Sequence, residues 1–324
     1  MNQTAMEHTG LTGLLFPGQG SQEMGMGRDL AETCKESMEL WKKAEKICGA
    51  PLRNIYWDGD EATMARTEYL QPALTVVNVS FWTKLAARFA CLAPAPCLAG
   101  HSLGEYSALA AAEVLPLDRI LELVALRGKL MAAADPHGAG KMVAVLKLDR
   151  GQVEEIVVAA RAGTQAEILI ANYNSPAQFV ISGAAAAVDA CNPLVRERKG
   201  RAVPLPVSGA FHSPLMAEAN RELAGYMAKL DWKKGKYLIY CNASGAACSD
   251  ADRLKDLMAR QMTSSVQWIN IIAAQWEAGV RTWYEIGPKS VLTRLLKANL
   301  DGRAEVWEGH SIASLEQIKT LMQK

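Results

Sequence analysis

The sequence predicts an α/β protein in which helices cover both faces of a parallel sheet and a smaller unit is inserted into the larger one. Two observations predict this fold class. Short apolar runs, loops and helical patterns alternate along most of the 324 residues, and this order is typical of a parallel sheet. Between residues 141 and 206 the elements become shorter and follow the order βαββαβ, which is the order of a ferredoxin-like unit.

The first elements of the larger unit are a strand, a tight loop and two helices. The apolar run from Leu11 to Phe16 stops at Pro17-Gly18-Gln19-Gly20, which predicts a buried strand that ends in a loop. Apolar residues at helical spacing predict one helix over 30–47. A second helix is expected over 71–90, and a short strand over 97–99 follows it.

The inserted unit is expected to contain four strands and two helices. The strands are expected at 142–146, 167–171, 179–182 and 202–205, and the helices at 151–162 and 184–196. Hinges are expected at 136–140 and 206–209. The large subdomain is therefore expected to comprise 1–140 and 207–324, and the small subdomain 141–206. Strands and helices of the large subdomain are expected to resume at 237–241, 254–262, 269–279 and 282–286.

Composition excludes several classes of protein. Lys and Arg total 35 against 34 Asp and Glu, so no overall charge attracts nucleic acid or a membrane surface. We find no signal peptide pattern and no apolar run long enough to cross a bilayer, so we expect a cytoplasmic protein. The seven cysteines form no C-x-x-C pair, which favours free, mostly buried thiols over disulfides or a metal site.

A candidate nucleophile lies in Gly100-His101-Ser102-Leu103-Gly104, a G-x-S-x-G sequence between a short apolar strand and an alanine-rich run. A serine on such a sharp strand-to-helix turn is exposed in a cleft, and the flanking glycines leave room for the backbone. The helix N-terminus beside it favours the negative charge of a tetrahedral intermediate. The sequence therefore predicts Ser102 as a nucleophile on a hydrolase-like large subdomain.

A serine nucleophile needs a base, and the chain has five histidines, at positions 8, 101, 137, 212 and 310. His8 lies in an expected tail, His137 in a hinge and His310 near the C-terminus. His101 is expected to point away from the cleft if Ser102 points into it. His212 lies in a loop between a strand and a helix, where catalytic residues are common, although a hydrogen-bonded loop histidine also explains it.

The usual hydrolase order places an acid between the serine and the histidine. Asp149 and Asp189 are available in this interval, but both lie in the expected small subdomain. We therefore expect a pair of Ser102 and His212 without a carboxylate, in which a backbone carbonyl orients the imidazole.

Seven stretches spread over nearly the whole chain form a highly specific combination. They are Phe16-Pro17-Gly18-Gln19-Gly20-Ser21-Gln22, Gln71-Pro72-Ala73-Leu74, Gly100-His101-Ser102-Leu103-Gly104-Glu105-Tyr106, Leu126-Arg127-Gly128, 172–182, Gly209-Ala210-Phe211-His212 and Glu285-Ile286-Gly287-Pro288. In these stretches the sequence resembles the malonyl-CoA:acyl-carrier-protein transacylases and the related acyltransferase domains of polyketide synthases.

The resemblance implies a role for each of five residues. Ser102 would be the nucleophile and His212 its base, and the backbone N–H groups of Gln19 and Leu103 would form the oxyanion hole. Arg127 would bind the free carboxylate of malonate, a task for which a planar guanidinium with two parallel donors is better suited than lysine. A surface ion pair is the alternative reading of Arg127.

The resemblance also implies supporting residues around the acyl group. Gln261 corresponds to the position whose main-chain carbonyl orients the histidine. Gln71, Asn172 and Asn174 correspond to positions near the acyl pocket, although capping of loop backbone also explains them. Phe211 resembles the residue of malonyl-selective members, in which a bulky ring crowds an α-methyl branch.

Two short segments depart from the family pattern. Lys289-Ser290 stands where glycine-lysine is usual after Gly287-Pro288, and Ser264-Ser265 stands where Asn-Pro is common before Val266. Both departures affect the expected shape of a loop and leave the expected chemistry unchanged.

The implied function is transfer of a malonyl group from malonyl-CoA to the phosphopantetheine thiol of an acyl carrier protein, through a malonyl-serine intermediate, for fatty-acid biosynthesis. The implied partners are the carrier protein and coenzyme A. We expect a monomer that needs no metal or cofactor and binds neither nucleic acid nor membrane. Whether the carrier serves fatty-acid or polyketide synthesis is left open. An acidic carrier calls for a basic patch, for which the candidates are Arg196, Arg198, Lys199 and Arg201, or Lys289, Arg294 and Lys297.

Two other functions remain open from the sequence. A serine hydrolase would use water in place of the second thiol, but a neutral ester does not require the cation at Arg127. A noncatalytic binding module would use Ser102 only as a turn residue, which leaves the joint presence of Ser102, His212 and Arg127 unexplained.

Overall fold

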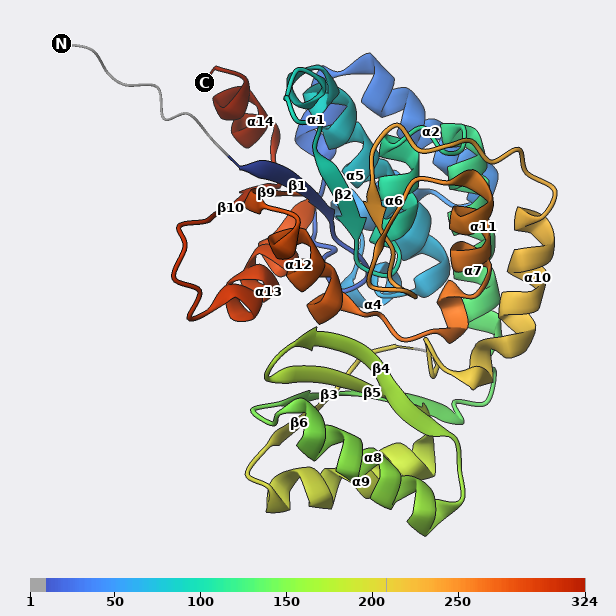
Figure 1. Cartoon of the computed structure of the whole chain (residues 1–324). Coiled ribbons are helices and arrows are strands. Elements are labelled where there is room, and N and C mark those ends of the chain that lie inside the picture. Colours follow the sequence, from blue (N-terminus) through green and yellow to red (C-terminus); the bar gives the residue numbers. More distant parts are fainter. Residues whose placement is uncertain (1–9, 208, 324) are drawn as a thin grey trace.

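The computed structural model describes residues 10–207 and 209–323, and it contains two sheets (Figure 1). The larger has the strand order β10-β9-β1-β2-β7-β8, and the smaller the order β4-β5-β3-β6. The strands are β1 (Leu11–Phe16), β2 (Cys97–Gly100), β3 (Gly140–Leu146), β4 (Ile168–Ser175), β5 (Gln178–Ala184), β6 (Arg201–Pro204), β7 (Ile239–Tyr240), β8 (Ala247–Cys248), β9 (Val280–Ile286) and β10 (Glu308–Ile312). His8 and Ser208, in the expected tail and the second expected hinge, lie outside the described residues.

The larger sheet is buried on both faces, as the sequence predicts. Leu14 and Phe16 of β1 belong to one apolar core, whereas Leu15 between them belongs to another. Successive side chains of a strand point to opposite faces, so this short run supplies both cores. β1 pairs in parallel with β2 and β9, and β7 and β10 continue the parallel order. Only β8, at one edge, is antiparallel.

Helices cover the two faces of the larger sheet (Figure 1). α5 and α6 pack on one face, with α7 packed against these two helices, and α12 and α13 pack on the other face. The α-helices are α1 (Arg28–Thr33), α2 (Lys35–Cys48), α3 (Leu52–Asp58), α4 (Glu61–Met64), α5 (Thr67–Ala90), α6 (Gly104–Ala111), α7 (Leu117–Ala133), α8 (Arg150–Thr164), α9 (Ala185–Glu197), α10 (Ala217–Met227), α11 (Ala251–Ala259), α12 (Trp268–Glu277), α13 (Val291–Leu300) and α14 (Leu315–Met322). Short 3₁₀ turns span η1 (Pro214–Met216), η2 (Gln261–Thr263) and η3 (Pro288–Ser290).

The smaller sheet is antiparallel and divides its side chains between two environments. Val143 and Val145 of β3 pack in a separate core with residues of α8 and α9. Met142 and Ala144, which alternate with them, face the core of the larger unit. The order βαββαβ predicted for this segment is the observed order. Figure 1 shows α8 and α9 on the side of this sheet away from the larger one.

Several elements differ from the sequence predictions, among them two helices and a strand. The single helix expected over 30–47 is two helices, because the backbone of Cys34 is extended between α1 and α2. The strand expected over 237–241 is reduced to Ile239–Tyr240, and the helix expected over 254–262 begins at Ala251 and continues as a 3₁₀ turn. The spacing of apolar residues indicates which face of a helix or strand is buried, but it does not determine where that element begins and ends.

All seven cysteines are free, and six of them are buried, as predicted. Across residues 10–207 and 209–323, every helix is too short or too polar to span a lipid bilayer.

The turn from β2 to α6 is packed against β1 without space for side chains at its glycines. A Cβ atom at Gly104 would lie 2.0 Å from the carbonyl oxygen of Phe16, and one at Gly100 would lie 2.0 Å from the carbonyl carbon of Gly104. Real carbon atoms do not approach so closely, and the obstacles are backbone atoms that cannot move aside. The two glycines therefore allow α6 to begin directly above the ends of β1 and β2.

Replacing Gly104 by alanine should lower the free energy of unfolding by about 3 kcal/mol, because the new methyl group overlaps the β1 backbone. Gly225 in α10 has no atom within 4 Å of its Cβ position, so Gly225→Ala is the matched control and should stabilise the helix by about 1 kcal/mol. Urea unfolding measures both values. Equal effects of the two substitutions would contradict the packing described for Gly104.

Candidate active site

Most of the residues predicted to form a site meet around a cavity of about 210 Å³ between the larger and the smaller sheet. The cavity is lined from both units, because Ser102 follows β2 whereas Asn172 and Asn174 belong to β4. The lining residues are Gly18, Gln19, His101, Ser102, Met131, Met142, Ala144, Asn172, Asn174, Gln178, Val180, Leu205, Val207, Phe211, His212, Val291, Leu292 and Leu295.

Ser102 occupies the predicted sharp turn between β2 and α6. Its φ is 50°, in the left-handed region that a residue with a Cβ rarely adopts. Asn242 holds this turn from the end of β7, because its Oδ1 accepts from the Ser102 N–H at 2.6 Å and its Nδ2 donates to the Gly100 carbonyl at 2.6 Å. The serine is thereby fixed with its hydroxyl at the cavity.

His212 lies next to the serine, as a base would have to. Its Nε2 is 2.7 Å from the Ser102 Oγ. Its Nδ1 is 3.2 Å from the main-chain oxygen of Gln261 and 3.0 Å from that of Ser264. Two carbonyl oxygens can only accept, so Nδ1 carries the proton and Nε2 is free to accept one from the serine. A backbone carbonyl does orient the imidazole, and Ser264 is a second such carbonyl that sequence reasoning missed.

Burial and charge keep His212 neutral. The side chain is buried, and burial, followed by the positive charge of Arg127, lowers its pKa to about 3. The φ of His212 is 57°, so this loop is also held in the left-handed region. A neutral imidazole at neutral pH is the form that can take a proton.

Arg127 in α7 is buried, which rules out the surface ion pair considered from the sequence. Its Nη1 donates to Gln71 Oε1 at 2.9 Å, and its Nη2 lies 3.3 Å from both Ser102 Oγ and Gln261 Oε1. Its guanidinium carbon is 5.5 Å from the centre of the Tyr106 ring. Burial lowers the pKa of Arg127 from its ordinary value, which lies far above neutrality, so the site contains a positive charge beside the serine.

Gln261 and Glu105 connect Ser102, Arg127 and Asn242 through hydrogen bonds. The Nε2 of Gln261 donates to Glu105 Oε2 at 2.8 Å and to the Ser102 carbonyl at 2.9 Å. The other oxygen of Glu105 accepts from the Asn242 N–H at 3.1 Å. Burial raises the pKa of Glu105 to about 7. The sequence contained signals for both missed residues, since Glu105 is a carboxylate in an apolar helix and Asn242 follows a parallel strand.

Two N–H groups near the serine have no acceptor among residues 10–207 and 209–323. They belong to Gln19, in the loop after β1, and to Leu103, which precedes α6. The two segments are close, because a Cβ at Gly18 would lie 3.5 Å from the Leu103 nitrogen. Unused backbone donors at a helix N-terminus suit a developing negative charge.

The remaining predicted residues surround the same space. Asn172 lies at an irregularity of β4 that bridges to Val266, and Phe211 lies in the cavity wall beside His212. His101 also lines the cavity, so the expectation that it points away from the cleft is wrong. Its Nε2 is 2.8 Å from Asn174 Oδ1, and this contact engages both side chains.

Other candidates from the sequence have separate structural roles. Asp149 caps α8 with a hydrogen bond to the Gln152 N–H, and Asp189 forms an ion pair with Lys141 at 2.7 Å. His310 lies in β10, where it pairs with Glu308. Neither aspartate approaches His212, which agrees with the expected pair without a carboxylate.

The two departures from the family pattern retain defined loop geometries. Lys289 and Ser290 have φ values of 73° and 51°, both left-handed. Ser265 donates its hydroxyl to the Ile170 carbonyl at 2.7 Å, next to the Ser264 oxygen that faces His212.

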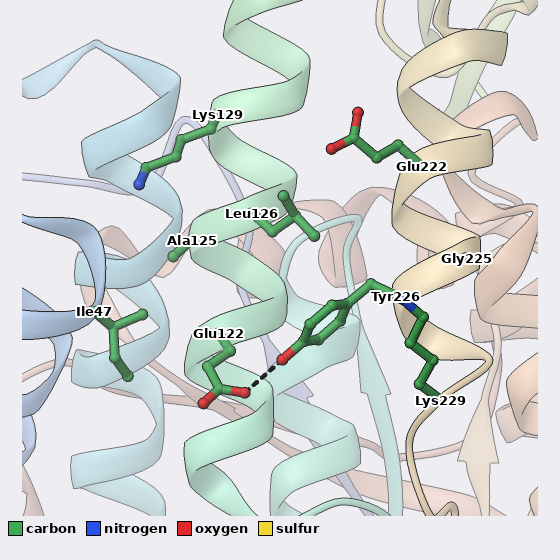
Figure 2. A pocket seen from close by; sticks show the side chains of 9 residues that line it. All are labelled: Ile47, Glu122, Ala125, Leu126, Lys129, Glu222, Gly225, Tyr226 and Lys229. Carbon is green, nitrogen blue, oxygen red and sulfur yellow. Dashed lines mark hydrogen bonds between the residues drawn. The ribbon is translucent and has the colours of Figure 1, made fainter.

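A larger cavity of about 600 Å³ lies elsewhere, among α2, α7 and α10 (Figure 2). Figure 2 shows Glu122 pointing to Tyr226, whose hydroxyl donates to it at 2.6 Å. Lys129 and Lys229 lie at its rim, but no serine, cysteine or histidine lines it. The smaller cavity at Ser102 therefore combines the groups needed for nucleophilic chemistry, and the larger one does not.

Arg127→Ala should raise the pKa of His212, because removing a nearby positive charge stabilises the imidazolium. The rate at which an uncharged sulfonyl fluoride modifies Ser102 should then fall at a higher pH in the variant than in the wild type. In the wild type, the rate of modification should not fall near pH 6.5. Arg119→Ala, on the exposed side of α7, is the control; a variant profile that coincides with that of the control would refute the coupling.

The comparisons with known proteins agree with this geometry. Residues 14–321 match the family model described as the acyl transferase domain. Malonyl CoA-acyl carrier protein transacylase of Staphylococcus aureus is 36% identical over 315 residues, which cover 95% of this chain and 97% of that relative. The protein of the same name from Synechocystis is 39% identical over 286 residues, which cover 88% and 92% of the two chains.

Solved structures give the same result. The malonyl-CoA:acyl carrier protein transacylase of Xanthomonas oryzae aligns with a TM-score of 0.88 at 35% identity, over 97% of this chain and 98% of that one. A malonyl-transacylase in complex with its type II polyketide synthase acyl-carrier protein aligns with a TM-score of 0.89 at 30% identity, over 97% and 99%. The chain therefore belongs to the malonyl-CoA:acyl carrier protein transacylase family and is an acyltransferase.

Proposed function

We propose that the protein transfers a malonyl group from malonyl-CoA to the phosphopantetheine thiol of an acyl carrier protein, by way of a malonyl ester on Ser102. One observation carries this proposal. The Ser102 hydroxyl lies within hydrogen-bond distance of a neutral imidazole and of a buried guanidinium, at 2.7 Å and 3.3 Å, and it faces a cavity. A nucleophile, its base and a cation for the substrate carboxylate are thus within one small space.

In the first half-reaction, Ser102 Oγ attacks the thioester carbonyl carbon while His212 Nε2 takes the hydroxyl proton. The carbonyl oxygen becomes an oxyanion, for which the free N–H groups of Gln19 and Leu103 are the proposed donors. When the carbon–sulfur bond breaks, His212 returns the proton to the departing coenzyme A sulfur. Ser102 then carries the malonyl ester.

In the second half-reaction, the phosphopantetheine thiol loses its proton to His212 and attacks the ester carbonyl. The carbon–oxygen bond of the ester breaks, and the proton returns to Ser102 Oγ. Every group required is a side chain or a backbone N–H, so the proposed reaction needs no cofactor and follows a ping-pong order.

Arg127 is the proposed ligand of the malonyl carboxylate. A buried guanidinium attracts a carboxylate strongly because little water screens the pair. Gln71, which accepts from Nη1, would hold its plane toward the cavity. Phe211 and Met131 would limit the space beside the acyl chain, since both line the cavity and are buried. A neutral ester gains nothing from this charge, which favours transfer of a dicarboxylic acyl group over simple ester hydrolysis.

The carrier protein would approach over the rim between the two sheets. We propose that residues 141–206 form a ferredoxin-like subdomain inserted into a hydrolase-like one, so that the acyl site lies at their junction. Of the two basic clusters, one lies at α13, since Lys289 precedes this helix and Arg294 and Lys297 lie within it. Val291 and Leu295 of the same helix line the cavity. This proximity favours the α13 cluster as the carrier contact for a monomeric cytoplasmic enzyme of fatty-acid synthesis.

Incubation with malonyl-CoA should add one malonyl group to Ser102, because the first half-reaction stores the acyl group as an ester. Mass spectrometry of the intact protein and its peptides measures this adduct. Addition of a carrier protein with its phosphopantetheine group should remove it. Ser102→Ala is the control, and a wild type that acquires no adduct would exclude the proposal.

Arg127→Ala should reduce acylation by malonyl-CoA about a hundredfold relative to acetyl-CoA, since a charge-assisted pair with the carboxylate is lost. Measuring acylation rates of Ser102 with both donors gives the ratio. An unchanged ratio would show that Arg127 does not bind the carboxylate.

A further inference from the structure

Among residues 10–207 and 209–323, the positive charge of Arg127 has no direct partner of opposite charge. All three of its hydrogen-bond acceptors, on Gln71, Gln261 and Ser102, are uncharged. No carboxylate in the described part of the chain forms a salt bridge with it. Burial of a charge without an opposite one beside it is costly, and the neutral acceptors and the Tyr106 ring offset this cost only in part, so a carboxylate farther away would stabilise the site.

The amide of Gln261 lies between Glu105 and Arg127 and forms a hydrogen bond with each of them. Glu105 is as deeply buried as the arginine, with 1% of each residue exposed. Its Oε2 accepts from Gln261 Nε2 at 2.8 Å, and the oxygen of the same amide accepts from Arg127 Nη2 at 3.3 Å. The three side chains therefore form a chain of hydrogen bonds from carboxylate to amide to guanidinium.

The direction of the Gln261 amide is fixed by its donors. Nε2 donates both to Glu105 and to the Ser102 carbonyl, so Oε1 has to face Arg127. The reverse orientation would direct N–H groups at the guanidinium and would leave Oε2 of Glu105 without its donor. The second oxygen of Glu105 accepts from the Asn242 N–H, which fixes the carboxylate in turn.

We propose that Glu105 is a positioning residue that, through the amide of Gln261, stabilises the charge of Arg127 and directs its guanidinium at Ser102 without pairing with it directly. This inference rests on the proposed function. A direct ion pair would occupy the N–H groups that the substrate carboxylate needs, whereas an intervening amide stabilises the charge and leaves Nη2 beside the serine. Glu105 would thus determine how strongly the site prefers a carboxylate-bearing acyl group.

Two variants test this role. In Glu105→Gln the new amide offers one oxygen to two N–H donors, so the Gln261 amide loses its fixed direction. In the double variant Glu105→Gln with Gln261→Glu, the number of charges is retained, but the carboxylate moves next to Arg127 and pairs with it. Glu122→Gln is the control, because Glu122 likewise accepts hydrogen bonds from two donors, Arg119 and Tyr226, and lies outside the cavity at Ser102.

The measured quantity is the ratio of Ser102 acylation rates with malonyl-CoA and acetyl-CoA, together with the thermal midpoint of each protein. We expect this ratio to fall about tenfold or more in both Glu105 variants and to stay at the wild-type value in Glu122→Gln. The double variant should not regain the ratio, and its thermal midpoint shows whether it is folded, because Gln261→Glu also removes the donor to the Ser102 carbonyl. A purely structural role would lower both acylation rates in parallel and would leave the ratio unchanged.

Each outcome separates this inference from the proposed function. A wild type that takes no malonyl group would end the proposed function itself. If the wild type is acylated and either Glu105 variant has the wild-type ratio of acylation rates, only the role of Glu105 is refuted. If Glu105→Gln does not fold, the double variant alone decides, because a wild-type ratio there refutes the role and a tenfold lower ratio supports it.

Discussion

A guanidinium removed from water loses hydration that hydrogen bonds to neutral groups replace only in part. At Arg127 this loss occurs within 3.3 Å of a serine hydroxyl that also contacts an imidazole. The neighbouring groups follow from this constraint. His212 stays neutral, and its Nδ1 donates to carbonyl oxygens in place of a carboxylate. The carboxylate of Glu105 is connected to the arginine only through the amide of Gln261. A direct carboxylate partner for the histidine would have competed for the same charge.

The same site depends on a connection between the two sheets. Segment 264–266 forms hydrogen bonds with the backbone of β4 through Val266 and with Ile170 through the Ser265 hydroxyl. The oxygen of Ser264 in this segment accepts from His212. The position of the imidazole is therefore coupled to the position of the smaller sheet, and a shift of that sheet changes the geometry at the serine.

Much of this arrangement could be predicted from the sequence. The strand before Ser102, the glycines around it and the loop of His212 have local signatures, and the order of elements in 141–206 follows from hydrophobic periodicity. The resemblance supplied the role of Arg127, which no local pattern distinguishes from a surface arginine. Asn242 and Glu105 were not predicted, because their residue types do not reveal which groups they contact. These contacts join positions more than 130 residues apart in the sequence. His101 was assigned the wrong direction because a left-handed turn places consecutive side chains differently from a strand.

The alternation along β3 has a consequence for how such enzymes diverge. Met142 and Ala144 line the cavity at Ser102, whereas Val143 and Val145 pack against α8 and α9 on the opposite face of the sheet. Side chains at positions 142 and 144 therefore shape the cavity wall from the face of β3 that is turned away from α8 and α9. Relatives can therefore differ in this part of the cavity wall while the Ser102 turn, which other segments form, keeps its geometry.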